Sequence, residues 1–199
     1  CFCLQLVNAA FFLTLNIYMT KCGYLDYEIA SYISYRFMAV MFFALPFGMY
    51  IKGKRLRPVF LSIALSVPTI SLIILEAIAY RIDWLLQISF ILWGIAFSGV
   101  FICTLPFILR NTDPSKHTAA ISLNTATWSI GTIVAGFGIY LLTLIAPNIF
   151  TNKILLQLFC LLGYTSVFFV LKMSKQEEVG EKSIGFNQQF YQYNWKAIA

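Results

Sequence analysis

The stretch from Trp84 to Leu109, WLLQISFILWGIAFSGVFICTLPFIL, runs for 26 residues without an Asp, Glu, Lys or Arg. About 20 apolar residues in a helix are enough to cross the hydrocarbon core of a bilayer. A spanning segment must satisfy its backbone groups internally, as a helix or as a strand of a closed barrel. Because the stretch lacks the apolar/polar alternation of barrel strands, it predicts a transmembrane helix.

The same pattern recurs on both sides of this stretch. Further charge-free runs cover 37–51, 58–75, 117–152 and 154–171, and the apolar segment at the start of the chain adds one more. Pro147 and Asn148 divide the longest run into two spans. The sequence therefore predicts an all-α, polytopic transmembrane bundle within residues 1–171, with spans at about 2–20, 29–51, 59–79, 84–109, 118–145 and 153–171.

The composition of the chain agrees with a membrane protein. Of its 199 residues, 60% are hydrophobic and 11% are charged, whereas a soluble domain has roughly 45–50% and about 25%. A water-soluble fold of this size would leave large apolar areas exposed. The composition therefore excludes a soluble enzyme, a disordered chain and a collagen-like protein.

The basic residues predict the orientation. One side of the expected bundle has only Lys21, Arg81 and Lys153, and the other side has nine, namely Lys52, Lys54, Arg55, Arg57, Arg110, Lys116, Lys172, Lys175 and Lys182. The positive-inside rule makes the richer side cytoplasmic, with both ends of the segment on that side, and the expected location is the plasma (cytoplasmic) membrane. This asymmetry accounts for the net charge of +6, so no nucleic-acid partner is expected, and the lipid bilayer is the partner of the spans.

The residues after the sixth span change in character. Residues 172–194 are polar and are expected to form a cytoplasmic linker. Residues 195–199, WKAIA, are typical of the start of a seventh helix, and the chain begins inside a span, so we expect a piece of a longer protein.

Residue types that perform catalysis or bind cofactors are sparse. His117 is the only histidine, and the five cysteines are scattered without a CxxC pair, so neither a metal site nor a cofactor is expected. The chain has no phosphate-binding loop, no GxSxG elbow and no paired carboxylates. An enzyme is not expected.

Four local stretches carry a resemblance to a known family. GYLDYEIA (23–30) is similar to the short outer loop after that family's first helix, and LPFG (45–48) with KGKRLR (52–57) occupies the place of its G-x-x-x-D-[RK]-x-G-[RK]-[RK] loop. PFILRNTDP (106–114) looks like the junction of its fourth and fifth helices, and YNWK (193–196) resembles the approach to its seventh. The chain thus resembles the N-terminal six-helix half of a major facilitator superfamily transporter, with Lys52 at the motif's Asp position and Arg55 at its second glycine.

The resemblance implies a fold and an activity. The six spans would form two inverted three-helix repeats, half of a twelve-helix transporter whose C-terminal half is missing from this segment. The first and fourth helices would line a central cavity, and a small solute such as a sugar, a nucleoside or a drug-like metabolite would cross by alternating access. The alternatives are a self-contained six-helix channel, a homodimeric half-transporter and a non-transporting membrane scaffold.

Polar and aromatic residues within the spans are the candidates for lining the cavity. Gln5, Asn8, Phe12 and Asn16 recur at helical spacing and define one face of the first span. Such a face is costly against lipid, so it should meet protein or water, and hydrogen bonding between helices would also explain it. The expected lining residues are Asn8, Phe12, Asn16, Arg36, Trp93 and Asn124.

Arg36 is the most informative single residue because it lies well inside the second span. A charge there is expensive unless it is paired or faces water. If the second and third helices are adjacent, Arg36 and Glu76 lie at similar depths and could form an intramembrane ion pair. The other two interpretations are that Arg36 binds an anionic group of a substrate, or that it snorkels to the outer interface.

Overall fold

The computed structural model describes residues 2–173, which form helices and connecting turns and contain no strand. The linker beyond Met173 and the expected seventh helix lie outside the described residues. The elements are α1 (Phe2–Lys21), α2 (Asp26–Ile51), α3 (Arg57–Ala79), α4 (Asp83–Asn111), the 3₁₀ turn η1 (Pro114–Lys116), α5 (His117–Ile145), α6 (Asn152–Gly163) and α7 (Thr165–Lys172). The predicted all-α fold is confirmed, and six segments, with α6 and α7 counted together, are long and apolar enough to cross a membrane, which supports an integral membrane protein.

Local sequence signals explain the turn between α1 and α2. Gly23, two residues after the end of α1, has φ +83°, a left-handed conformation that glycine adopts without strain. The carboxylate of Glu28 accepts a hydrogen bond from the backbone N–H of Leu25 at 2.8 Å. Because this bond satisfies a free donor at the helix start, α2 begins at Asp26, three residues before the predicted start.

The predicted sixth span is divided into α6 and α7 by one residue, Tyr164, whose backbone keeps helical angles of φ −64° and ψ −21°. α6 ends at Gly163 and α7 begins at Thr165, and a Cβ at Gly163 would lie 2.6 Å from a methyl carbon of Val7. The hydroxyl of Thr165 donates to the carbonyl of Leu162 at 2.6 Å, a local bond that competes with regular helix geometry. Close packing and this bond accompany the division, which the sequence analysis did not predict.

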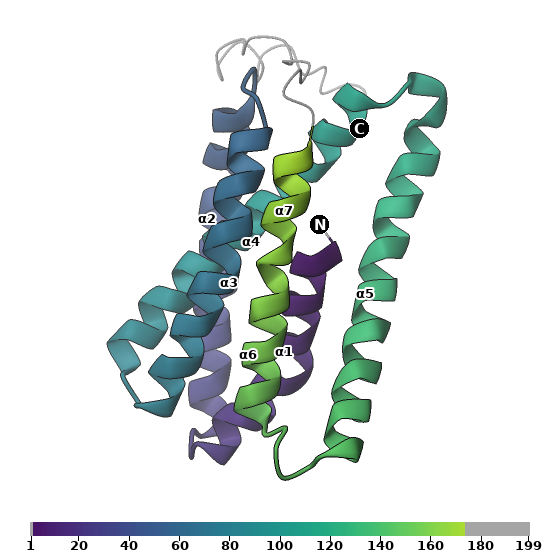
Figure 1. Cartoon of the computed structure of the whole chain (residues 1–199). Coiled ribbons are helices and arrows are strands. Elements are labelled where there is room, and N and C mark those ends of the chain that lie inside the picture. The colour runs from purple at the N-terminus through teal and green to yellow at the C-terminus, as the bar shows by residue number, and fades with distance from the viewer. Residues whose placement is uncertain (1, 174–199) are drawn as a thin grey trace, which may run out of the picture.

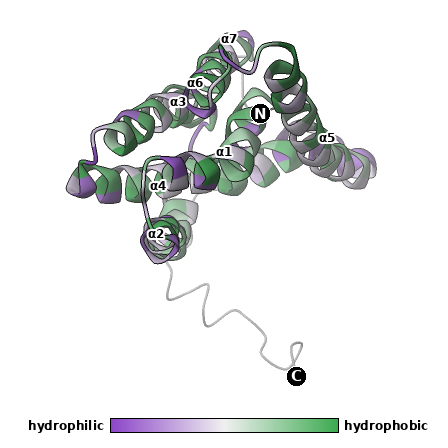
Figure 2. Cartoon of the chain, turned by 90° about the horizontal axis from the view of Figure 1, so that it is seen from below, coloured by the Kyte–Doolittle hydropathy of each residue, from purple (hydrophilic) through white to green (hydrophobic). Residues whose placement is uncertain are grey.

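The helices pack with α1 and α4 at the centre. α2 packs along α4 and α5 packs along α1, while α3 packs mainly on α4, α6 packs on α1, and α3 and α6 pack against each other. Seen along the bundle in Figure 2, α3, α6 and α7 form one edge, and α2 and α5 occupy outer positions. α1 and α4 are accordingly the most buried spans, while α2 and α5 are the least buried (Figure 1).

This arrangement corrects one expectation. The second and third helices were expected to be adjacent, but α2 and α3 both pack on α4, which lies between them (Figure 2). Residues at equal depth on α2 and α3 are therefore separated by a helix.

Glycine sets the distance between α2 and α4. A Cβ at Gly94 would lie only 2.4 Å from the carbonyl oxygen of Arg36, so only glycine permits this approach of the two backbones. Gly131 plays a similar part on α5, where a Cβ would lie 2.9 Å from the side chain of Gln5 on α1. The first of these contacts fixes the position of Arg36 against α4.

Candidate functional site

Arg36 lies inside the helix bundle and not at its surface. It follows Asp26, the first residue of α2, by ten positions, which corresponds to a depth of about 15 Å. Only 7% of the residue is exposed. Snorkelling to the outer interface is therefore not observed, and the cation is held by neighbouring side chains.

One neighbour supplies a hydrogen bond. The Nη2 of Arg36 donates to Oδ1 of Asn8 on α1, at 2.9 Å, and both residues are buried. A hydrogen bond from a charged donor to an amide oxygen in a water-excluded setting is stronger than a neutral one. Asn8 therefore joins α1 to α2 through the charge of Arg36.

The other neighbours are aromatic rings. The guanidinium carbon of Arg36 lies 3.9 Å from the centroid of Trp93, 4.8 Å from that of Phe12, 5.5 Å from that of Phe97 and 5.6 Å from that of Phe37. A cation over a ring face is stabilised by about 2 kcal/mol or more when water is excluded. These rings offset part of the cost of burying the charge.

The rings are themselves held by further ring contacts. Trp93 touches Phe11 of α1 at a centroid distance of 5.3 Å and Phe90 of α4 at 6.2 Å, and Phe90 stacks with Tyr32 of α2 at 6.1 Å. The hydroxyl of Tyr32 donates to Asp83 at 2.9 Å. Helices α1, α2 and α4 thus hold the guanidinium in a pre-formed aromatic enclosure.

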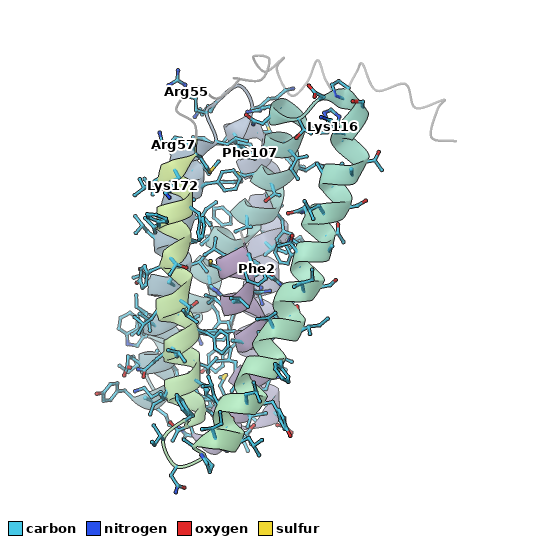
Figure 3. All side chains as sticks on the ribbon, turned by 45° about the vertical axis from the view of Figure 1, so that its right-hand side comes forward. Phe2, Arg55, Arg57, Phe107, Lys116 and Lys172 are labelled. Atoms are coloured by element: carbon cyan, nitrogen blue, oxygen red, sulfur yellow. The ribbon has the colours of Figure 1, made fainter. Side chains whose placement is uncertain are left out.

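A small cavity lies beside the guanidinium. Its volume is about 90 Å³, and Arg36 and Asn16 are the polar residues of its lining, which also includes Phe11, Phe12, Leu15, Ile33, Phe90 and Trp93. A cavity of this volume holds several water molecules. A larger cavity of about 370 Å³ is lined by Phe2, Phe60 and Phe107 among others, and Figure 3 shows Phe2 near the middle of the bundle and Phe107 toward its basic end. Its lining is apolar apart from Cys3, Thr104 and Ser166, so we place the candidate site at Arg36.

The expected polar face of α1 divides into two roles. Gln5 donates to the hydroxyl of Thr132 on α5 at 3.3 Å, which is a bond between helices. Asn8 holds Arg36, while Phe12, which is 55% exposed, and Asn16 line the cavity. The structure thus brings together five of the six expected lining residues, namely Asn8, Phe12, Asn16, Arg36 and Trp93. Asn124 lies on α5 and is not part of this lining.

The expected ion pair between Arg36 and Glu76 is not formed. A carboxylate oxygen of Glu76 lies 2.9 Å from Nζ of Lys153, and its other oxygen accepts from Gln157 at 3.2 Å, so Glu76 joins α3 to α6. The prediction failed because it assumed that α2 and α3 are adjacent. Lys153, which the sequence analysis treated only as a loop charge, is the residue that it missed.

The predicted basic loop connects α2 and α3. Gly53 has φ +69° in the turn, Arg110 at the end of α4 donates to the carbonyl of Lys54 at 3.0 Å, and Arg57 donates to the carbonyl of Leu171 at 2.8 Å. The loop, which contains Lys52, Lys54, Arg55 and Arg57, lies at the same end of the bundle as Lys116 and Lys172 (Figure 3). Arg57 thus ties the start of α3 to α7, and Arg110 ties the end of α4 to the loop.

Within residues 2–173 no three His, Cys, Asp or Glu side chains gather where they could hold a metal ion. Comparison with protein-family models, with curated proteins and with solved structures finds no match for this chain. The functional conclusion therefore rests on the packing of the helices and on the chemistry around Arg36.

Proposed function

We propose that this chain forms one half of a secondary transporter of the major facilitator type, which moves a small solute across the membrane by alternating access. The observation that carries the proposal is a symmetry in the helix packing. Exchanging α1 with α4, α2 with α5, and α3 with α6 converts the α2–α4 contact into the α5–α1 contact. Under the same exchange the α3–α4 contact corresponds to the α6–α1 contact, and the α3–α6 contact is unchanged.

This pattern is what two three-helix repeats would produce. Because each repeat has an odd number of spans, the second repeat crosses the membrane in the opposite sense to the first. Inverted repeats of this kind are common in secondary transporters, where the binding site lies near the midplane at the repeat interface. The minor contact between α1 and α3 has no equally strong counterpart between α4 and α6 among the described helices.

The location of Arg36 supports the proposal. α1 and α4 are the first helices of the two repeats, and Asn8 on α1 and Trp93 on α4 both contact Arg36. A buried cation deep in a spanning helix is by default a functional residue. The exposed faces of Phe12 and Asn16 would then border the central cavity, opposite the C-terminal half of the transporter.

The partners and the location follow from the same proposal. The solute enters from one side at a time, the basic loop faces the cytoplasm, and both ends of the segment lie on that side. The C-terminal six-helix half completes the cavity. No cofactor takes part.

Counterflow in proteoliposomes tests this function. The full-length protein is reconstituted, the liposomes are loaded with an unlabelled solute, and uptake of the same labelled solute is followed across a panel of metabolites. A transporter gives a transient accumulation of label that requires the preloaded solute. Uptake without this dependence would favour a channel, and no uptake of any solute in the panel would favour a scaffold.

A further inference from the structure

We infer that the solute bound at Arg36 carries a carboxylate on an apolar or aromatic body. The biological meaning of this inference rests on the proposed transport function, because it names the class of solute for the same site. The binding itself is a separate claim and can be tested without transport.

The charge balance of the site is the first reason. The salt bridges among residues 2–173 join Lys116 to Asp113 and Lys153 to Glu76, and neither involves Arg36. Asp83, at the start of α4, accepts a hydrogen bond from the hydroxyl of Tyr32. Coulomb attraction between an anion and a buried cation is stronger than in water, because the surrounding protein screens it less. The site thus favours an anion and disfavours a cationic solute.

The supply of hydrogen-bond donors is the second reason. A guanidinium has five N–H donors, and the side-chain bond of Arg36 to Asn8 uses one nitrogen of the three. A carboxylate accepts several hydrogen bonds and donates none, so it matches this surplus. A neutral sugar would need acceptors, which the lining offers only at Asn16.

The walls of the cavity are the third reason. Phe12, Leu15, Ile33 and Trp93 surround the charge with apolar and aromatic surface. In a cavity of about 90 Å³ the carboxylate would meet the guanidinium and the adjoining part of an apolar body would cover these walls, while the rest of the solute would extend into the central cavity of the proposed transporter. A small inorganic anion would make no apolar contact with these walls.

Benzoate and its neutral isostere benzamide provide the test. The full-length protein is placed in lipid nanodiscs, and thermal unfolding is recorded with each compound at constant ionic strength. We expect benzoate to raise the unfolding temperature in a saturable manner and benzamide to have no comparable effect. Equal stabilisation by the two compounds, or none by benzoate, would overturn the inference.

Variants at the cation provide the second part of the test. Arg36→Gln should weaken benzoate binding by about tenfold or more, since it removes a charge-assisted interaction, and Arg36→Lys should retain part of the affinity. Arg81→Gln is the matched control, because Arg81 is an arginine bound to the carbonyl of Gly23 in the outer turn. Unchanged benzoate affinity in folded Arg36→Gln would overturn the inference.

A third variant keeps the experiment decisive if Arg36→Gln does not fold. Asn8→Asp places a carboxylate where the guanidinium already finds the oxygen of Asn8, at 2.9 Å. This internal anion should preserve the fold and abolish benzoate binding, whereas Asn148→Asp in the exposed α5–α6 turn should leave binding intact. Benzoate binding by Asn8→Asp at the affinity of the unmodified protein would contradict the inference. Benzoate binding without counterflow would uphold the inference and reject the transport function.

Discussion

At the residue scale, Arg36 shows how a single charge can organise the middle of a helix bundle. Its guanidinium meets an amide oxygen of α1 and the rings of α1, α2 and α4. Each interaction alone is worth a few kcal/mol at most, less than the cost of an isolated buried ion. The site is stable because the interactions act together, and it keeps donor capacity for a further acceptor.

The ring beneath the cation should be important for stability. Replacing Trp93 with leucine removes both a buried indole and the closest cation–π contact, so we expect a loss of about 3 kcal/mol in the free energy of unfolding. Trp84 on the same helix is 65% exposed, and Trp84→Leu should change stability by less than about 0.5 kcal/mol. Denaturant unfolding in detergent measures both variants, and equal losses would contradict the assigned role of Trp93.

The Glu76–Lys153 pair should contribute little. Both side chains are partly exposed, at 45% and 32%, and such pairs typically contribute 0 to about 1 kcal/mol. A double-mutant cycle with Glu76→Gln and Lys153→Gln measures the coupling directly. A coupling energy of about 3 kcal/mol or more would mean that this pair, and not the ring contacts of α1 and α4, is the main electrostatic contact of the bundle.

At the element scale, the distance between α2 and α4 depends on one glycine. Gly94→Ala would place a Cβ 2.4 Å from the carbonyl oxygen of Arg36, so the helices must separate at an expected cost of about 1–3 kcal/mol. Because Arg36 would move with α2, benzoate affinity should fall as well.

Gly136→Ala is the matched control for this substitution. A Cβ there would meet only Leu13, at an ordinary contact distance of 3.5 Å, and alanine improves helix propensity by up to about 1 kcal/mol. We therefore expect unchanged or slightly higher stability, measured by the same unfolding experiment. A loss at Gly136 equal to that at Gly94 would show that helix packing does not distinguish the two positions.

The elements themselves could be predicted largely from the sequence, because length and freedom from charge decide a membrane span. Gly23 and the charged loops marked the helix ends to within a few residues. The division between α6 and α7 could not be predicted, since Gly163 packs there against Val7 of α1, a contact that only the packed bundle provides.

The candidate site could be predicted in part. Asn8, Phe12, Asn16 and Arg36 were identifiable as polar or charged residues placed where lipid would penalise them. The partner of Arg36 was assigned wrongly because depth along a helix can be counted from sequence, whereas the neighbour of that helix cannot. The partner of Glu76 was missed for the same reason.

At the scale of the whole molecule, the bundle has two chemically different ends. The basic α2–α3 loop lies at one end, and the α5–α6 turn, with Asn148, lies at the other (Figure 1). On a background without native cysteines, Arg55→Cys should react with a membrane-impermeant maleimide only from the cytoplasmic face and Asn148→Cys only from the opposite face. Labelling of both positions from the same face would contradict the six-span topology.

The same labelling experiment at Asn16 tests most directly whether the site at Arg36 opens alternately to the two faces of the membrane. Asn16 is exposed and lines the cavity beside Arg36, so a cysteine there reports which face of the membrane reaches the site. Alternating access predicts that Asn16→Cys reacts from the cytoplasmic face in inside-out vesicles and from the outer face in right-side-out vesicles, while Arg55→Cys and Asn148→Cys each react from one face. Reaction of Asn16→Cys from a single face under all conditions would contradict the account.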